Sequence, residues 1–196
     1  MTTTFTHKDL GFTLIETLVA VTILTVSIVA PMVLASQSLQ SAYYARDQII
    51  AENLAQEALE AVRQVRDGQI LQIAKATDDT GIDLFGPIPI DQNFNVDPTA
   101  STIIRTCPDD DCTQSPLKTN GILYGYHNEV GWTNTQFYRT VYVTYVPGPG
   151  QITPGPGRSD EIRVKVDVTW KTQFLPPRTV TISENMYRWV NGGSGN

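Results

Sequence analysis

The hydrophobic and polar positions of the chain divide it into an apolar run, an amphipathic helix and several alternating strands. Residues 12–35 contain one charged side chain, Glu16, and are otherwise predominantly apolar. A helix rises about 1.5 Å per residue, so this run would cover roughly 36 Å, and the hydrocarbon core of a bilayer is about 30 Å thick. The run is therefore predicted to be a transmembrane helix.

The pattern after the apolar run stays helical but becomes amphipathic. No glycine or proline falls between residues 32 and 67, and Gly68 is a suitable stop signal. A continuous helix of about 55 residues, roughly 80 Å long, is predicted over 12–66. Apolar residues recur at spacings of three, four or seven and form one stripe, whose members are Leu39, Tyr43, Ile50, Leu54, Ala58, Ala61 or Val62, and Val65.

Alternation with a period of two predicts strands at 138–146, 161–171 and 178–183, the last one continuing toward residue 190. The proline- and glycine-rich segment 147–157 is predicted to be an exposed hairpin loop. An antiparallel sheet at 137–190 would cover the apolar stripe of the helix. The predicted fold class is therefore α+β, with a long N-terminal helix packed against a C-terminal antiparallel sheet.

Residues 69–136 are predicted to connect the helix to the sheet, with one or two short strands near 88–90 and 101–106. Residues 191–196 are predicted to form a flexible tail. Trp132, Phe137 and Tyr138 could form an exposed binding patch, although aromatic residues beside a strand more often belong to the core.

The residues before the apolar run are also informative. Gly11 lies between a short polar leader, which contains His7 and Lys8, and the apolar run. A secretory signal has an apolar region of about 7–15 residues and is cleaved on its far side. A cut after Gly11 would instead remove the leader and keep the helix. Residues 11–16, GFTLIE, resemble the prepilin signature of type IV pilins and type II secretion pseudopilins.

This resemblance implies that a prepilin peptidase cleaves after Gly11, that the new N-terminal Phe12 is methylated, and that the helix packs with copies of itself. The implied segments are a leader at 1–11, a filament-core helix at 12–35, its amphipathic continuation at 36–68 and a variable region at 69–136. The implied partners are other pilin or pseudopilin subunits, the prepilin peptidase/methyltransferase, an inner-membrane assembly platform and, before assembly, the lipid bilayer. Residues 51–63 also resemble minor pilins of the PilV type.

Two interruptions of the apolar run have specific interpretations. Glu16 interacts favourably with the helix dipole, by about 0.3–1 kcal/mol when exposed. An acid inside a membrane-length segment usually has a partner or a role, and the resemblance implies pairing with the free amine of a neighbouring subunit. Pro31 removes one backbone hydrogen bond and is predicted to kink or loosen the helix. Hydroxyl groups are expected to bond helix carbonyls at Thr13, Thr17, Thr22, Thr25 and Ser27.

The two cysteines, Cys107 and Cys112, lie close together in the sequence and predict a disulfide in an oxidising compartment. They do not make a convincing four-ligand zinc site with His7 and His127. The three aspartates at 109–111 are of a type that binds calcium, but this ion prefers about six to eight oxygen ligands, so a solvated acidic turn is favoured. No metal or cofactor is expected.

The net charge of −6, without a clustered basic face, argues against a nucleic-acid partner. His127 is predicted to be a surface residue in a turn, and no catalytic constellation is evident, which disfavours an anchored hydrolase. The leading hypothesis is a filament subunit that is not an enzyme. It would be a single-pass inner-membrane protein with a cytoplasmic leader, although Lys8 is a weak topology signal. The alternative is a membrane-anchored binding or adhesion module that does not polymerise.

Overall fold

The structure, a computed structural model, describes residues 11–75, 83–147, 161–172 and 176–188. The leader residues 1–10, the tail at 191–196 and most of the predicted hairpin loop lie outside the described residues. The long helix α1 (Leu14–Lys75) has 62 residues, which fall into two compact units formed by residues 1–45 and 46–196. The predicted fold class is confirmed, because a long helix precedes an antiparallel sheet in a pilin-like α+β architecture.

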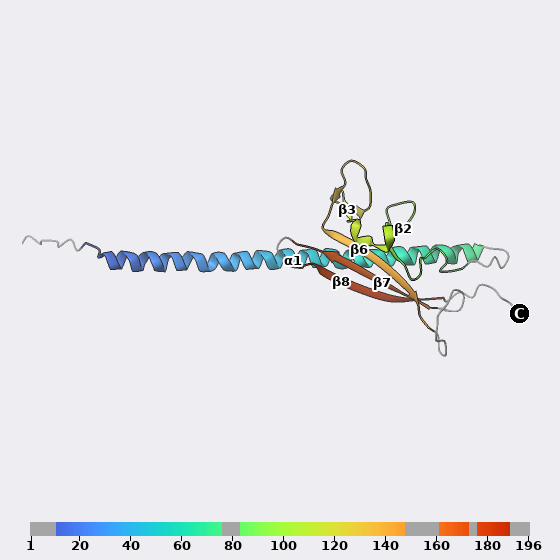
Figure 1. Ribbon diagram of the computed structural model, residues 1–196, viewed down its shortest axis with the longest axis horizontal. Helices are drawn as coiled ribbons and strands as arrows, with labels where there is room; N and C mark the ends of the chain where they lie inside the picture. Colours follow the sequence, from blue (N-terminus) through green and yellow to red (C-terminus); the bar gives the residue numbers. More distant parts are fainter. Residues whose placement is uncertain (1–10, 76–82, 148–160, 173–175, 189–196) are drawn as a thin grey trace, which may run out of the picture. The chain divides into compact units, whose positions relative to one another are not determined.

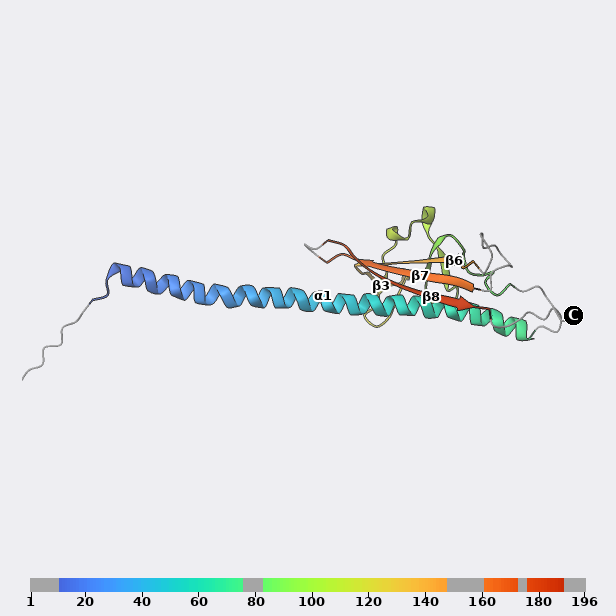
Figure 2. The ribbon, with the colours of Figure 1, turned by 90° about the horizontal axis from the view of Figure 1, so that it is seen from below.

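In the second unit, α1 from residue 46 onward packs against a five-stranded antiparallel sheet with the order β2-β1-β6-β7-β8. In two perpendicular views the strands β6, β7 and β8 run alongside the cyan-to-green part of α1 (Figures 1 and 2). Helix and sheet therefore form two layers. The five strands are β1 (Asn93–Val96), β2 (Ile104–Thr106), β6 (Phe137–Tyr145), β7 (Glu161–Trp170) and β8 (Arg178–Tyr187).

Strand β7 pairs with β6 from Ile162 to Trp170 and with β8 from Glu161 to Trp170. Its even-numbered residues are buried and its odd-numbered residues are exposed or half-buried, as the period-two pattern predicted. The three predicted long strands are therefore confirmed. The last one extends beyond residue 183 to Tyr187 because Met186, which is buried, still faces the core.

The core lies between this face of the sheet and one stripe of α1. Ala51, Ala55 and Ala58 have no exposed surface, and their small side chains allow a strand layer to pack closely on the helix. Of the predicted stripe, Leu54, Ala58, Ala61 and Val62 are buried and Ile50 and Val65 are half-buried, whereas Leu39 and Tyr43 belong to the other unit and are exposed. Other buried side chains of the core are Leu54, Leu59, Val62, Phe94, Val96, Val141, Val143, Ile162, Val164, Val166, Val168 and Trp170.

Helix α1 continues past the predicted stop at Gly68 and ends at Lys75. A glycine within a helix costs about 0.5–1 kcal/mol relative to alanine, which weakens the helix without ending it. A glycine ends a helix well where it adopts a left-handed conformation, and Gly68 does not have a positive φ. A Cβ built at Gly68 would meet no atom within 4 Å. The expected boundary at residue 68 is therefore wrong for the helix.

The connecting region was predicted to hold one or two short strands, but residues 83–136 contain five. Strands β1 and β2 extend the main sheet beyond β6. The other three, β3 (Lys118–Thr119), β4 (Tyr124–Gly125) and β5 (Thr133–Asn134), form a second sheet with the order β4-β3-β5. We refer to residues 107–136, which contain this sheet, as the lobe. Strands of two residues show no alternation, which is why the hydrophobic pattern did not reveal them.

A fully buried arginine lies where α1, β1 and β6 meet. Arg139 donates hydrogen bonds to the carbonyl oxygens of Leu54 in α1, at 3.1 Å, and of Val96 in β1. The carboxylate of Glu57 lies 3.6 Å from the same guanidinium group. Burial raises the pKa of Glu57 above its ordinary value, although the charge of Arg139 opposes this shift. Arg139 thus connects the helix layer to two strands.

A buried acid makes a second connection. Asp47 in α1 is 6% exposed, and its carboxylate accepts hydrogen bonds from the side-chain amide of Gln136, at 2.8 Å, and from the hydroxyl of Thr172, at 3.2 Å. These partners lie just before β6 and just after β7. The two buried charged groups therefore fix the sheet on α1 at two positions along the helix.

Candidate functional site

The N-terminal end of α1 contains the predicted processing and assembly residues. Gly11 and Phe12 precede the helix, and Phe12 is 80% exposed. The backbone N–H of Glu16 donates to the carbonyl oxygen of Thr13 at 3.1 Å and to its Oγ1 at 3.3 Å, and the backbone N–H of Thr17 donates to the same carbonyl at 3.2 Å. Thr13 is therefore the N-cap of α1.

Thr13 and Glu16 have the spacing of a capping box, in which a threonine at the N-cap is followed three residues later by a glutamate. This sequence signal could have identified the role of Thr13, which had been expected only to bond helix carbonyls in lipid. The positive end of the helix dipole also favours an acid in this turn. The capping pattern and the dipole both favour a carboxylate at Glu16, beside the predicted cleavage site, even when no neighbouring subunit is present.

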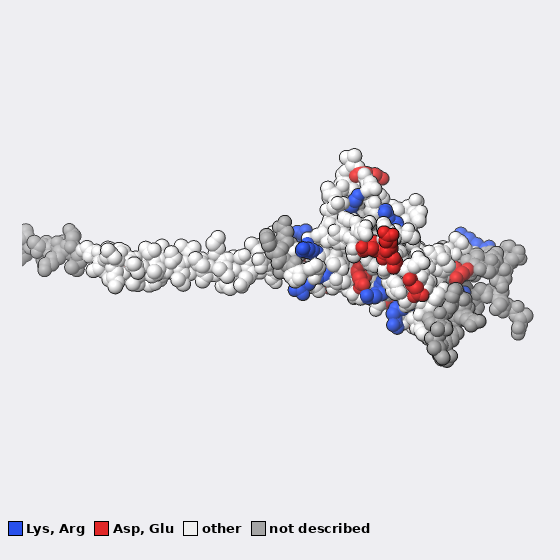
Figure 3. Space-filling model, in the orientation of Figure 1, with Lys and Arg blue, Asp and Glu red and all other residues white. Residues whose placement is uncertain are grey.

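The remaining part of α1 in the first unit presents apolar side chains on all sides. Among the described residues, α1 holds the one stretch that is long and apolar enough to cross a membrane, and none of that stretch is buried. Figure 3 shows no charged side chain on the displayed face of this segment. The large exposed side chains are Phe12, Leu14, Ile15, Leu18, Val19, Val21, Ile23, Leu24, Val26, Ile28, Val29, Met32, Val33 and Leu34. A surface of this kind requires lipid or other apolar helices to cover it.

The hydroxyl groups of this segment bond the helix itself, as predicted. Thr17 donates to the carbonyl oxygen of Leu14, and Thr22 to that of Val19, each at 2.8 Å. Thr25 and Ser27 do the same one turn back, at 2.8 and 2.7 Å. These four hydroxyl groups therefore need no partner from the surroundings.

Helical conformation is continuous through Pro31, which lies inside α1. Proline has no backbone N–H, so the carbonyl oxygen four residues earlier, at Ser27, lacks its usual helical donor. This turn of the helix is therefore weaker, because proline cannot supply that hydrogen bond. The kink at Pro31 stays a prediction.

The structure joins Cys107 and Cys112 in a disulfide, with Cα atoms 5.0 Å apart. The segment around it forms two short 3₁₀ turns, η1 (Pro108–Asp110) and η2 (Cys112–Gln114). The carboxylate of Asp110 accepts hydrogen bonds from the backbone and side chain of Asn93 in β1, and that of Asp111 accepts from Thr113. Within the described ranges, no cluster of histidine, cysteine and acidic residues is suited to a metal ion.

His127 was predicted to be a surface residue, but the structure half-buries it beside Asp97 and Thr99. Its Nε2 lies 2.6 Å from the hydroxyl of Thr99 and 3.8 Å from the carboxylate of Asp97, and its ring packs on Trp132 with centroids 4.5 Å apart. In a nucleophilic triad the acid orients the histidine from the ring nitrogen opposite the hydroxyl. Here the acid and the hydroxyl approach the same nitrogen, so the cluster is not arranged as a triad.

The sequence left open whether the aromatic residues beside β6 form an exposed binding patch or part of the core. Phe137 is buried in the core and packs edge-on against Tyr124, with ring centroids 6.4 Å apart. Trp132 and Tyr138 are half-buried. The core interpretation therefore holds for Phe137.

Comparison with known families supports the assignment of the N-terminal segment. Residues 6–30 match the family described as the prokaryotic N-terminal methylation motif, and the match includes Gly11, Phe12 and Glu16. This motif is the signature of type IV pilins and pseudopilins, and it implies processing by a prepilin peptidase and assembly with other pilins. Comparison with curated proteins and with solved structures finds no match to the chain.

The motif and the fold together bear on the class of protein. The apolar helix and the methylation motif indicate a membrane-anchored protein. The motif and the pilin-like architecture indicate a structural subunit and not an enzyme.

Proposed function

We propose that this chain is a minor pilin or pseudopilin that polymerises into a type IV pilus or a type II secretion-type filament. The leader remains in the cytoplasm, and the peptidase cleaves between Gly11 and Phe12. The second unit lies on the extracytoplasmic side of the inner membrane until an assembly platform transfers α1 into the filament. The observation that carries the proposal is the methylation motif at residues 6–30, which leads directly into a helix with an uncovered apolar surface.

The energetics of this transfer follow from the chemistry of the helix surface. Lipid chains and neighbouring apolar helices are similarly hydrophobic, so burial of apolar area alone does not favour leaving the bilayer. Close packing and charge pairing must supply the difference. Because the hydroxyl groups of Thr17, Thr22, Thr25 and Ser27 already bond helix carbonyls, the helix changes its surroundings without exposing unpaired donors.

Glu16 supplies the charge for such pairing. Cleavage creates an α-amino group at Phe12, with an ordinary pKa of about 7.7–8.0, which is therefore largely cationic near neutral pH. The positive end of the helix dipole disfavours a cation at this position, and an apolar environment makes an unpaired charge more costly. A carboxylate from the first turn of a neighbouring α1 neutralises the amine. This pairing is the assembly role that we assign to Glu16.

The first test is the mass and N-terminal sequence of the protein isolated from cells with an active prepilin peptidase. The proposal requires a mature chain that begins with methylated Phe12. A membrane-anchored binding module that does not polymerise would instead retain Met1 or Thr2, or would be cut beyond Ala35. Either of those results would contradict the proposal.

The second test separates the two roles of Glu16. Glu16→Gln keeps a side chain that suits the capping box but removes the charge, whereas Glu16→Ala removes both. Both variants should be processed and remain in the membrane, yet be absent from sheared filaments. Glu129→Gln, which neutralises an exposed acid in the lobe, is the matched control and should assemble normally. Normal assembly of Glu16→Gln would show that Glu16 acts as a helix-capping residue.

A further inference from the structure

A small cavity of about 310 Å³ lies where the main sheet, the disulfide-linked segment and the second sheet meet. Arg105 comes from β2, Gln114 and Ser115 directly follow the disulfide, and Lys118 and Asn134 are paired across β3 and β5. Asn128 and Tyr126 complete its polar lining. All these residues belong to the second unit, and no part of the filament-forming helix is involved.

Two cations line this cavity without a carboxylate partner among the described residues. The guanidinium of Arg105 lies 5.1 Å from the centre of the Tyr126 ring and donates to the carbonyl oxygen of Tyr126 at 3.4 Å. The ammonium group of Lys118 donates to the side-chain oxygen of Asn128. The carboxylate of Asp111, which lies near Gln114, is bound by Thr113 and Gln114. Neither cation therefore forms an ion pair with a described carboxylate.

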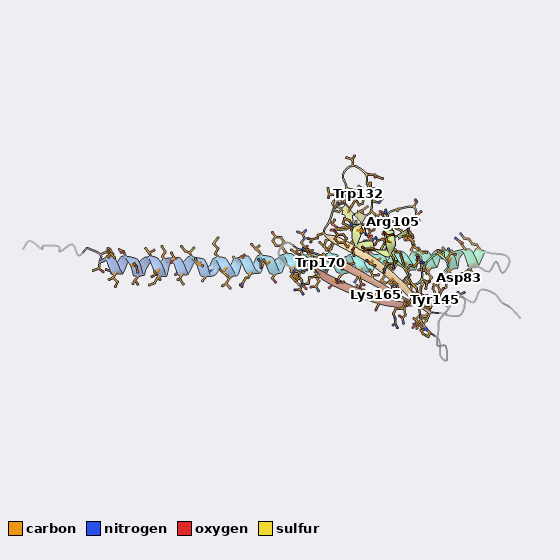
Figure 4. The ribbon with its side chains drawn as sticks, viewed as in Figure 1. Asp83, Arg105, Trp132, Tyr145, Lys165 and Trp170 are labelled. Atoms are coloured by element: carbon orange, nitrogen blue, oxygen red, sulfur yellow. A yellow bond between two sulfur atoms is a disulfide. The ribbon has the colours of Figure 1, made fainter. Side chains whose placement is uncertain are left out.

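In a second cavity, by contrast, the arginine is paired with carboxylates. A groove of about 980 Å³ near the end of α1 also contains an arginine, Arg63. That side chain is paired with Glu60 and, through two hydrogen bonds of 2.6 and 2.7 Å, with Glu184. The smaller cavity thus contains two basic side chains, on a protein whose net charge is −6. Figure 4 labels Arg105 on the lobe side of the sheet, where Figure 3 shows basic atoms at the surface beside a larger acidic patch.

The two cations favour a ligand with an anionic group, and the other lining groups indicate which further groups that ligand carries. The hydroxyl of Ser115 and the side-chain amide of Asn134 form no hydrogen bond with the described part of the chain, so both are available to a ligand. An amide offers donors and an acceptor, which suits a ligand with several hydroxyl groups. The cavity corresponds to roughly ten water molecules at about 30 Å³ each, so it holds one ring-sized molecule and excludes a helix.

We propose that this cavity binds a sugar acid, a polyhydroxylated ring that carries one carboxylate. Arg105 and Lys118 bind the carboxylate, and Ser115, Asn134 and Gln114 bind the hydroxyl groups. Arginine presents donors in a fork that matches a carboxylate. A single negative charge suits the site better than a phosphate dianion, because the acidic turn at 109–111 lies close by in the chain. This binding function goes beyond filament assembly and does not depend on it.

The experiment measures binding of sodium galacturonate to the full chain by saturation-transfer difference NMR. The chain is held in a polyoxyethylene detergent, which carries no sugar. The expected dissociation constant is on the order of 1 mM, as is usual for a ligand of this size. Galactose lacks the carboxylate and acetate lacks the hydroxyl groups, so each should bind at least tenfold more weakly. Trigalacturonate tests whether the ligand is a free sugar acid or the end of a polysaccharide. Binding as tight as that of galacturonate, or tighter, would indicate the end of a polysaccharide, and weaker binding would indicate a free sugar acid.

Variants test the residues. Arg105→Gln and Lys118→Gln should each weaken galacturonate binding at least tenfold, whereas Lys165→Gln, the same change at an exposed position of β7, should leave it unchanged. Near-UV circular dichroism verifies the fold, and Lys118→Gln keeps the test valid if loss of the Arg105–Tyr126 contact disturbs the lobe. Equal binding of inorganic phosphate or galactose, or full binding by both variants, would overturn the proposal.

Discussion

Arg139 is a charged side chain without exposed surface in the centre of the helix–sheet core. Its favourable interactions are a near contact with Glu57 and hydrogen bonds to two carbonyl oxygens. The cost of burying its charge offsets much of this gain, so such a group adds little net stability compared with a well-packed apolar residue. Its removal is different, because it takes this partner away from one carboxylate and two carbonyl oxygens.

Arg139→Met is therefore expected to lower the free energy of unfolding by about 3 kcal/mol, the lower end of the range for broken buried pairs. The lower end applies because the side chain of Glu57 is 33% exposed and can be partly solvated. Adding Glu57→Gln to this variant should restore part of the loss. Urea denaturation of the full chain in micelles measures both changes, and Arg163→Met, at an exposed position of β7, should stay within about 0.5 kcal/mol of the parent protein.

Asp97 gives the stability a defined dependence on pH. Burial alone would raise its pKa, but hydrogen bonds from Thr99 and from the backbone N–H of Tyr126 outweigh this effect, and the pKa lies below its ordinary value. A carboxyl group with a lowered pKa in the folded state stabilises the fold above its unfolded pKa of about 3.9. This stabilisation is lost as the pH falls through the folded pKa.

The free energy of unfolding should therefore fall on acidification below about pH 4, and Asp97→Asn should flatten this dependence. Glu57 acts with the opposite sign, because its pKa is raised and its protonation relieves the cost of burial as the pH falls. The difference between the parent protein and Asp97→Asn at each pH isolates the contribution of Asp97. A difference that stays constant from pH 6 to pH 2.5 would contradict the prediction.

At the level of elements, the continuation of α1 through Gly68 has a direct consequence. Because Gly68 is helical and a Cβ there meets no atom within 4 Å, Gly68→Ala should stabilise the second unit by about 0.5–1 kcal/mol. The midpoint of thermal unfolding measures this effect. Gly125→Ala is the opposite case, because a Cβ there would lie 2.9 Å from the His127 ring and 3.2 Å from the Asp97 carboxylate. A destabilised Gly68→Ala would indicate that the helix ends earlier.

Elements with a long repeated pattern could be predicted from the sequence, and short elements could not. The ten alternating residues of β7 identified both the strand and its buried face. The two-residue strands β3, β4 and β5 have no period, and their pairing depends on contacts between distant residues. Arg139 was missed because the inward positions of β6 were judged by their apolar members. The available signal was that Arg139, a charged residue, lies on the same face of the strand as Phe137 and Val141.

The same distinction applies to the candidate sites. Gly11, Phe12 and Glu16 lie in one continuous motif, so the sequence alone identified the segment that matches the methylation-motif family. The lobe cavity combines residues from β2, the disulfide-linked segment and the second sheet, and no local pattern connects them. Arg105 and Lys118 are unremarkable in sequence. Only the folded structure reveals that neither side chain has a carboxylate partner among the described residues.

For the whole molecule, the division at residue 45 separates two kinds of environment. The helix of the first unit presents apolar side chains to its surroundings and satisfies its backbone internally, which suits lipid. The second unit buries its apolar residues between α1 and the sheet and carries most of the charged residues. Different interactions therefore stabilise the two units, and denaturants should affect them differently.

Urea titration of the full chain in detergent micelles should reveal this difference. The near-UV circular dichroism of the second unit, which contains Trp132 and Trp170, should disappear in one cooperative transition. A substantial far-UV helical signal should persist beyond that transition, because residues 14–45 stay helical in an apolar medium. Simultaneous loss of the two signals would show that the units unfold as one.

The inward-turned hydroxyl groups of α1 make the outside of this rod almost purely hydrocarbon. Such a surface makes similar contacts with lipid acyl chains and with the apolar helix of another copy. Transfer of the helix between these two environments therefore changes the free energy little in either direction. In the proposed filament, growth and disassembly would therefore depend on the few charges at the N-terminal end of each helix and on the assembly platform. A fibre built in this way is as easily withdrawn as it is extended.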